Sequence, residues 1–117
     1  MKTMICKPFD VVEVPFPFSD LPRAKRRKAL VLSEHSFSEK NGCSVLTMIT
    51  SATHSDWDLD MPIVDWDRAG LRKPCVVRLK VFTLDNGLIV ERSGHLSDRD
   101  KRQVIEALRA ALPAILI

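Results

Sequence analysis

The sequence has few of the residues and none of the motifs on which several large enzyme classes depend. It holds only four glycines among 117 residues, and it has no glycine-rich phosphate loop, no Gly-x-Ser-x-Gly elbow and no His-Glu-x-x-His motif. Each of these patterns is needed to place backbone groups, a nucleophile or metal ligands at a fixed spacing. We therefore expect any catalysis by this chain to use no metal and no organic cofactor.

Cysteine and long apolar runs are equally scarce. Cys6, Cys43 and Cys75 form an odd, widely spaced set without a Cys-x-x-Cys or Cys-x-x-His pair, which argues against a disulfide framework and a zinc site. No apolar run approaches the roughly 18 residues that span a bilayer, and the start of the chain lacks the ~7 to 15 apolar residues of a signal peptide. These absences predict a soluble cytoplasmic protein with reduced thiols and no membrane partner.

Acidic and basic residues nearly balance, so the net charge by itself identifies no partner. The chain has 18 Lys and Arg against 15 Asp and Glu, which gives +3. The excess is local, because the chain outside residues 23–28 has 13 basic and 15 acidic residues. The local cations are Arg23, Lys25, Arg26, Arg27 and Lys28. Adjacent cations repel one another unless they are solvated or bind anions. The cluster is therefore either a solvated loop or a site that binds a phosphodiester backbone, and the sequence favours neither alternative here.

Short apolar runs rich in β-branched residues alternate with turn signals. They predict strands over residues 10–15, 29–33 and 44–50, and a hairpin of residues 75–84 and 88–90 across the turn Asp85-Asn86-Gly87. Ser97 then opens a capping box, and apolar residues at helical spacing continue to Pro113. Strands this short must close on one another to hide their edges. We expect a mainly β (α+β) fold, a small barrel with one C-terminal amphipathic helix, in a single domain over residues 1–117.

Polar side chains at strand ends and inside apolar strands are the candidate ligands. Thr50 and Ser51 end a predicted strand, where their hydroxyls either donate to a phosphate oxygen or satisfy turn backbone. Arg78 interrupts an apolar strand, so it faces solvent or a polar cleft that holds an anion. His54 is the histidine that we would test for acid–base work.

The two tryptophans are the aromatic candidates for base stacking. Trp57 lies between Asp56 and Asp58, and Trp66 lies between two further aspartates. Carboxylates on both sides would repel a phosphate backbone. The sequence therefore favours packing or a protein interface for both tryptophans.

Several stretches of the chain resemble one family in the same order. They are residues 9–20, 26–33, 49–52, 69–71, 73–79, 82–85 and 94–97, and they are similar to the PemK/MazF family of toxin ribonucleases of type II toxin–antitoxin systems. The resemblance implies an SH3-like barrel, shared with the gyrase-poisoning CcdB toxins, and a homodimer. It also implies metal-independent cleavage of single-stranded RNA to 2′,3′-cyclic phosphate and 5′-hydroxyl ends, and a cognate acidic antitoxin.

The same resemblance implies roles for individual residues. Arg27 and Thr50 would be the catalytic pair. Lys28 stands where the family usually has proline, and Lys80 stands where some members carry an acidic residue. The histidine that some members carry in the loop before Arg27 is also absent. The absent histidine and Lys80 favour a scheme in which Arg27 and Thr50 act without a carboxylate or a histidine. The RNA-binding groove would contain Lys25, Arg26, Lys28, Ser51 and Arg78.

Two alternatives use the same barrel. One is a gyrase poison, although poisons of this fold place a tryptophan close to the C-terminus and this sequence ends Pro-Ala-Ile-Leu-Ile. The other is a barrel that binds RNA but has lost cleavage because of Lys28 or Lys80. RNA cleavage measured beside gyrase-dependent DNA cleavage separates these functions.

Overall fold

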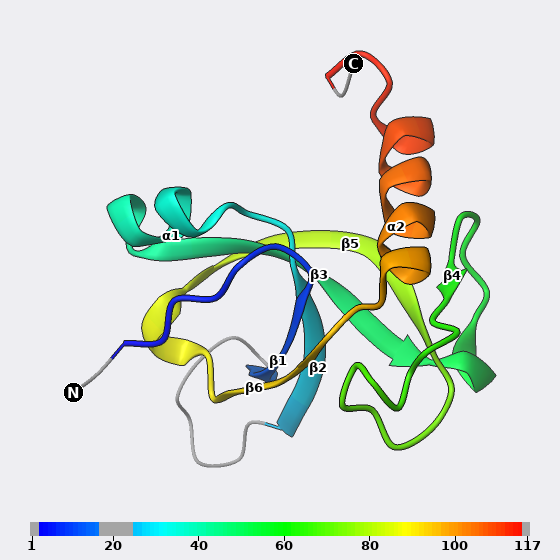
Figure 1. Ribbon diagram of the computed structural model, residues 1–117, viewed down its shortest axis with the longest axis horizontal. Helices are drawn as coiled ribbons and strands as arrows, with labels where there is room; N and C mark the ends of the chain where they lie inside the picture. The colour runs from blue at the N-terminus through cyan, green and yellow to red at the C-terminus, as the bar shows by residue number, and fades with distance from the viewer. Residues whose placement is uncertain (1–2, 17–24, 116–117) are drawn as a thin grey trace.

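Strands form most of the ordered framework and belong to one sheet. The computed structural model describes residues 3–16 and 25–115. The sheet is antiparallel, with strand order β4-β5-β3-β2-β1-β6. Its strands are β1 (Asp10–Phe16), β2 (Lys25–Val31), β3 (Cys43–Ser51), β4 (Met61–Pro62), β5 (Cys75–Asp85) and β6 (Glu91–His95). The sheet curls into a half-barrel, and β1 and β2 cross below the long strands β3 and β5 in Figure 1.

Apolar side chains alternate along the strands and form a core on each face of the sheet. The first face, called here the helix face, is covered by α2 (Asp98–Ala111). Its core includes Val11, Leu30, Ile49, Val77, Val104 and Ala107. The core of the opposite face consists of Cys6, Val12, Val14, Ala29, Val31, Leu46, Leu84 and Ile89. Because both faces are buried, a slip of one residue in register would exchange the two cores, and this fixes the pairing of the strands.

α2 begins where the sequence predicts it, and its first turn holds a neighbouring loop. Ser97 is the N-cap, and its hydroxyl accepts a hydrogen bond from the backbone N–H of Asp100. The Asp100 carboxylate is buried and accepts from the backbone N–H groups of Val64 and Asp65, both at 2.9 Å. The cap therefore ties the segment after β4 to the helix. The expected fold, mainly β with a C-terminal helix, is confirmed.

The expected hairpin between residues 75–84 and 88–90 is wrong. Asn86–Leu88 form a 3-10 helix, η2, and β6 pairs with β1 rather than with β5. The Asn86 side chain is buried, donates to the Ser38 carbonyl oxygen and accepts from the Ser44 hydroxyl. Ser38 belongs to α1 (His35–Asn41), a helix that we did not expect. Asn86 thus serves as a buried hydrogen-bonding centre rather than as a turn residue between paired strands.

The boundaries of β2 also differ from the expectation. The strand begins at Lys25 instead of residue 29, so the basic run is part of the sheet. Gly70 brings the loop before β5 against β6, because its φ is +77° and a Cβ there would overlap the Ser93 carbonyl oxygen. Within the described ranges, no helix is both long and apolar enough to cross a membrane.

Candidate nucleic-acid interface

Arg27 and Thr50, the expected catalytic pair, lie on neighbouring strands at the same end of the sheet. The pairing of β2 with β3 is recorded as far as Ala29 opposite Met48. Arg27 and Thr50 each lie two residues beyond this last recorded pair on their own strands. Residues two apart on a strand share a face, and Ala29 belongs to the core of the opposite face. Arg27 and Thr50 therefore both project to that face.

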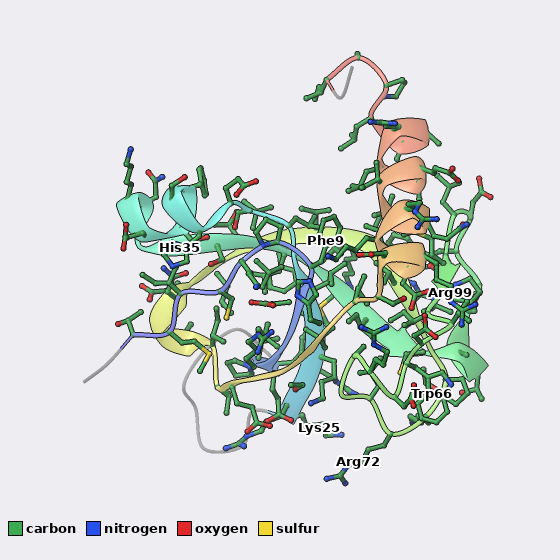
Figure 2. The ribbon with its side chains drawn as sticks, in the orientation of Figure 1. Phe9, Lys25, His35, Trp66, Arg72 and Arg99 are labelled. Carbon is green, nitrogen blue, oxygen red and sulfur yellow. The ribbon has the colours of Figure 1, made fainter. Side chains whose placement is uncertain are left out.

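The Arg27 guanidinium is exposed and lies near an aromatic ring. Its central carbon is 6.0 Å from the centroid of the Phe16 ring on β1. Within residues 3–16 and 25–115, no carboxylate forms an ion pair with Arg27 or with Lys25, which projects to the same face. Lys25 is visible at the lower end of β2 in Figure 2. Two exposed cations at this end of the sheet are thus available to an anion.

Arg26 and Lys28 alternate with Arg27 along β2 and project to the helix face. Glu13 of β1 contacts both: Arg26 Nη1 lies 3.4 Å from its Oε2, and Lys28 Nζ lies 3.7 Å from its Oε1. Lys28 Nζ also donates to Ser93 Oγ at 2.6 Å. The run of cations that looked continuous in sequence is therefore divided between two faces, and one half of it has a carboxylate partner.

Arg78 is held by two aspartates of the segment between β3 and β4. Its Nε and Nη2 donate to the two carboxylate oxygens of Asp60 at 3.2 and 2.9 Å, and Nη2 also donates to Asp56 Oδ1 at 3.0 Å. The Arg78 guanidinium holds the pKa of Asp60 below its usual range, and Asp60 in turn raises the pKa of Arg78. Arg78 Cζ also lies 5.0 Å from the centroid of the Trp57 ring. Arg78 thus joins a segment of loop to the sheet.

A β-bulge sets the direction of Arg78. The register of β3 with β5 shifts between Thr47, opposite Val81, and Met48, opposite Arg78. The buried Thr47 hydroxyl donates to the Arg78 carbonyl oxygen and satisfies a polar group at the break in the ladder. Residues directly opposite each other share a face. Arg78 therefore projects to the same face as Met48 and Thr50.

Ser51 forms local hydrogen bonds at the end of β3. Ser51 is the N-cap of η1 (Ala52–His54), and its hydroxyl accepts from the backbone N–H of Thr53 at 3.4 Å. The same hydroxyl lies 2.9 Å from Thr53 Oγ1. This geometry favours the turn-satisfying role of Ser51 over contact with phosphate. Arg23 and the side chain of His54 lie outside the described residues.

Two clefts among the described residues are lined by side chains other than the expected catalytic pair. One, of about 530 Å³, is lined by Lys28 and Glu13 together with cations from the loop before β5. Another, of about 480 Å³, lies at the start of α2. Neither is lined by Arg27 or Thr50. In the described part of the chain, no three His, Cys, Asp or Glu side chains gather as a metal ion requires.

Sequence comparison identifies the family. Residues 7–112 match the family model described as "PemK-like, MazF-like toxin of type II toxin-antitoxin system". The chain belongs to this family of toxins. The resemblance drawn from the sequence is thereby confirmed. No curated protein matches this MazF-like toxin in sequence.

Solved structures share the fold of this MazF-like toxin at low sequence identity. MazF from Deinococcus radiodurans has a TM-score of 0.72 and 18% identity, over 94% of this chain and 98% of that one. An endoribonuclease from a Mycobacterial species has a TM-score of 0.73 and 12% identity, over 97% and 96%. An endoribonuclease in complex with its cognate antitoxin, also Mycobacterial, has a TM-score of 0.70 and 15% identity, over 93% and 94%. These likenesses confirm the architecture.

Sequence reasoning missed the partners of Arg78. In the sequence, Asp56 and Asp58 stand out only as charges on either side of Trp57. The pairing of β4 with β5 sets Met61 opposite Val77, and Asp60 and Arg78 are the next residues of the two segments. That register depends on contacts between distant parts of the chain, so no local pattern in the toxin sequence reveals it.

Proposed function

We propose that this toxin is a metal-independent endoribonuclease that cleaves single-stranded RNA, with Arg27 and Thr50 as its catalytic pair. The observation that carries the proposal is their position, on adjacent strands and on one face, with an Arg27 guanidinium that has no carboxylate partner in the described ranges. Family membership supports the role as a toxin. Two structures of similar fold are named endoribonucleases.

The proposed reaction is an internal displacement at phosphorus. The ribose 2′-hydroxyl loses its proton and its oxygen bonds to the adjacent phosphorus, while the bond from phosphorus to the 5′-oxygen breaks and that oxygen gains a proton. Negative charge grows on the nonbridging oxygens in the transition state, and donors already aimed at them stabilise it. Arg27 supplies a planar, permanently charged donor, and the Thr50 hydroxyl supplies a second. The products carry 2′,3′-cyclic phosphate and 5′-hydroxyl ends.

The remaining candidate residues take different parts in this proposal. Lys25 projects to the same face as Arg27 and binds a neighbouring phosphate. Arg26 and Lys28 add positive potential at the edge of the interface, where Glu13 offsets part of their charge. Their contribution is long-ranged and is therefore more sensitive to salt than a direct contact.

A partner protein and a second copy of the chain complete the proposal. We propose that residues 1–117 form a single domain that acts in the cytoplasm as a homodimer, and that a cognate acidic antitoxin silences it. One Mycobacterial endoribonuclease of similar fold is described in complex with its cognate antitoxin. An acidic segment that lies over Lys25 and Arg27 would compete with RNA for the same cations.

Cleavage of a single-stranded RNA by the purified protein in EDTA tests this function. We expect Arg27→Ala to lower the cleavage rate about 100- to 1,000-fold, the usual effect of removing one donor to a developing oxyanion. Thr50→Val, which keeps the shape and removes the hydroxyl, should also lower the rate, whereas Thr50→Ser should retain most of it. End-group analysis should find cyclic phosphate.

Arg26→Ala is the matched comparison, because it removes the same charge from the same strand but from the other face. We expect it to cause only a small loss that disappears at high salt. Equal losses for Arg26→Ala and Arg27→Ala would overturn the site assignment. RNA bound without cleavage would instead favour the non-catalytic barrel.

A further inference from the structure

Trp57 is an exposed aromatic side chain whose position is fixed by its neighbours. It is 48% exposed and lies in the segment between η1 and β4. Single exposed apolar residues are common and do not by themselves indicate a binding site. Here the Arg78 guanidinium lies over the ring, 5.0 Å from the centroid, and the Trp57 backbone N–H donates to Asp60 Oδ2 at 3.3 Å. The indole is therefore both exposed and held.

The support beneath Trp57 is itself rigid. Asp60 is bound to Arg78 by two hydrogen bonds in a fork geometry, and its side chain is only 3% exposed. Arg78 is in turn anchored to the sheet through the hydrogen bond from Thr47 to its carbonyl oxygen. A planar ring that is ordered before binding loses little entropy when a ligand stacks on it.

Arg78, which lies over the Trp57 ring, is a diagonal neighbour of Thr50 across the sheet. Thr50 is opposite Val76, and Arg78 is two residues further along β5 on the same face. Diagonal neighbours of this kind lie about 7–8 Å apart across a sheet. An RNA whose phosphate is held at Arg27 and Thr50 therefore has its adjoining nucleotide within reach of the ring above Arg78.

The charges around Trp57 favour contact with a base rather than with a phosphate. Asp56 and Asp60 both pair with Arg78, whose single positive charge offsets only one of the two carboxylates, so the loop keeps a net negative charge. Asp58 remains exposed, and it keeps the sugar–phosphate backbone on the side of Lys25 and Arg27. A neutral base has no such repulsion and can extend from that backbone onto the indole.

We propose that Trp57 is a stacking platform for the base next to the scissile phosphate, and that Arg78 and Asp60 are positioning residues that hold it. The inference rests on the proposed cleavage of single-stranded RNA. It gives Arg78 an indirect part in binding RNA, through the ring that it supports, instead of direct contact with phosphate. Stacking on an aromatic ring accepts every base, so Trp57 contributes affinity more than sequence preference.

Fluorescence of Trp57 tests the proposal directly. The chain has two tryptophans, so a Trp66→Phe background leaves Trp57 as the only reporter. The probe is a mixed-sequence 2′-O-methyl RNA oligonucleotide, which cannot be cleaved because its 2′-oxygen is blocked. We expect its binding to quench the emission. Trp57→Leu should weaken binding about 5- to 150-fold, the range found for loss of one base stack, while Trp57→Phe should retain most of the affinity.

Controls separate stacking from other roles of the ring. Phe37→Ala removes another exposed aromatic, on α1, and should leave binding unchanged. An oligonucleotide with an abasic site at the position next to the cleaved bond should bind wild type and Trp57→Leu equally. Asp60→Asn should weaken binding of the intact oligonucleotide and not of the abasic one, because it loosens the ring and leaves the phosphate contacts in place.

The outcomes distinguish this inference from the function on which it rests. If wild type cleaves RNA and Trp57→Leu binds the oligonucleotide equally well, the stacking platform is refuted and the endoribonuclease stands. If Leu and Phe at position 57 weaken binding equally, the ring makes an ordinary apolar contact and the platform is refuted as well. If wild type neither binds nor cleaves RNA, the function and the inference fail together.

Discussion

Asp100 should contribute far more to stability than Asp98, although both are acidic residues in the first turn of α2. Both lie near the positive end of the helix dipole, which favours anions. In the structure the Asp98 side chain is 85% exposed and pairs with Lys101 at 3.6 Å. Asp100 is 2% exposed and accepts two backbone N–H groups of the segment after β4. Replacing each by alanine tests whether the helix dipole or the buried hydrogen bonds contribute more to stability.

The expected magnitude follows from the hydrogen bonds of Asp100. A hydrogen bond to a charged group contributes about 1.5–3 kcal/mol, and the alanine variant leaves two N–H donors without their acceptor. Because losses within one network do not add fully, we expect Asp100→Ala to lower the free energy of unfolding by about 3–4 kcal/mol. Asp100→Asn keeps the shape but turns an NH2 group toward one donor, so about half that loss is expected. Asp98→Ala should change stability by less than about 0.5 kcal/mol.

Urea unfolding at neutral pH, followed by circular dichroism, measures all three variants on one scale. A loss of about 3 kcal/mol corresponds to a fall in Tm of roughly 10–15 °C for a domain of this size. If Asp98→Ala costs as much as Asp100→Ala, the helix dipole dominates and the reasoning from buried hydrogen bonds is refuted. A fully stable Asp100→Asn variant would refute it too.

Two further predictions concern a steric overlap at Gly70 and the dependence of stability on pH through Asp10. Gly70→Ala should lower the free energy of unfolding by about 3 kcal/mol, because the added Cβ meets the Ser93 carbonyl oxygen and φ is positive. Gly42 has a similar φ of +72° but open space around it, so Gly42→Ala should lower it by only about 1 kcal/mol in the same urea assay. Burial would raise the pKa of Asp10, but hydrogen bonds from the Lys7 backbone and from side chains lower it overall. Its stabilising effect is therefore present above its ordinary pKa and lost as the pH falls. Asp10→Asn should differ most from wild type near neutral pH and least near pH 3, and a difference that grows in acid would contradict this assignment.

The strands were predictable because their evidence is local. Val11, Val12 and Val14 identify β1 from β-branched content, and Ser97 identifies the start of α2 from its cap. α1 was missed because its residues show no apolar period. Its one buried residue, Ser38, accepts a hydrogen bond from Ser44 at its hydroxyl and one from the distant Asn86 at its backbone carbonyl oxygen.

The candidate site was predictable in residue identity but not in arrangement. Arg27 and Thr50 came from a family resemblance, and the register of β2 with β3 sets them on one face. The family resemblance and the run of cations predict Arg26 and Lys28 in the same groove as Arg27, with a strand that begins only at residue 29. Once β2 extends to Lys25, alternation separates them, and this depends on pairing with β1. Composition and residue spacing do not reveal which strands pair, so they could not assign these side chains to one face of the sheet or the other.

The junction between β1 and β6 has a consequence for synthesis of the protein. Asp10, near the start of the chain, stands opposite His95, so the first strand receives its second neighbour only after nearly the whole chain has been made. Ribosomes add about 5–20 residues per second, and contacts between distant residues form slowly. For several seconds β1 therefore has an unpaired edge that other chains can capture. Each newly made copy is therefore prone to aggregation until β6 has paired with β1.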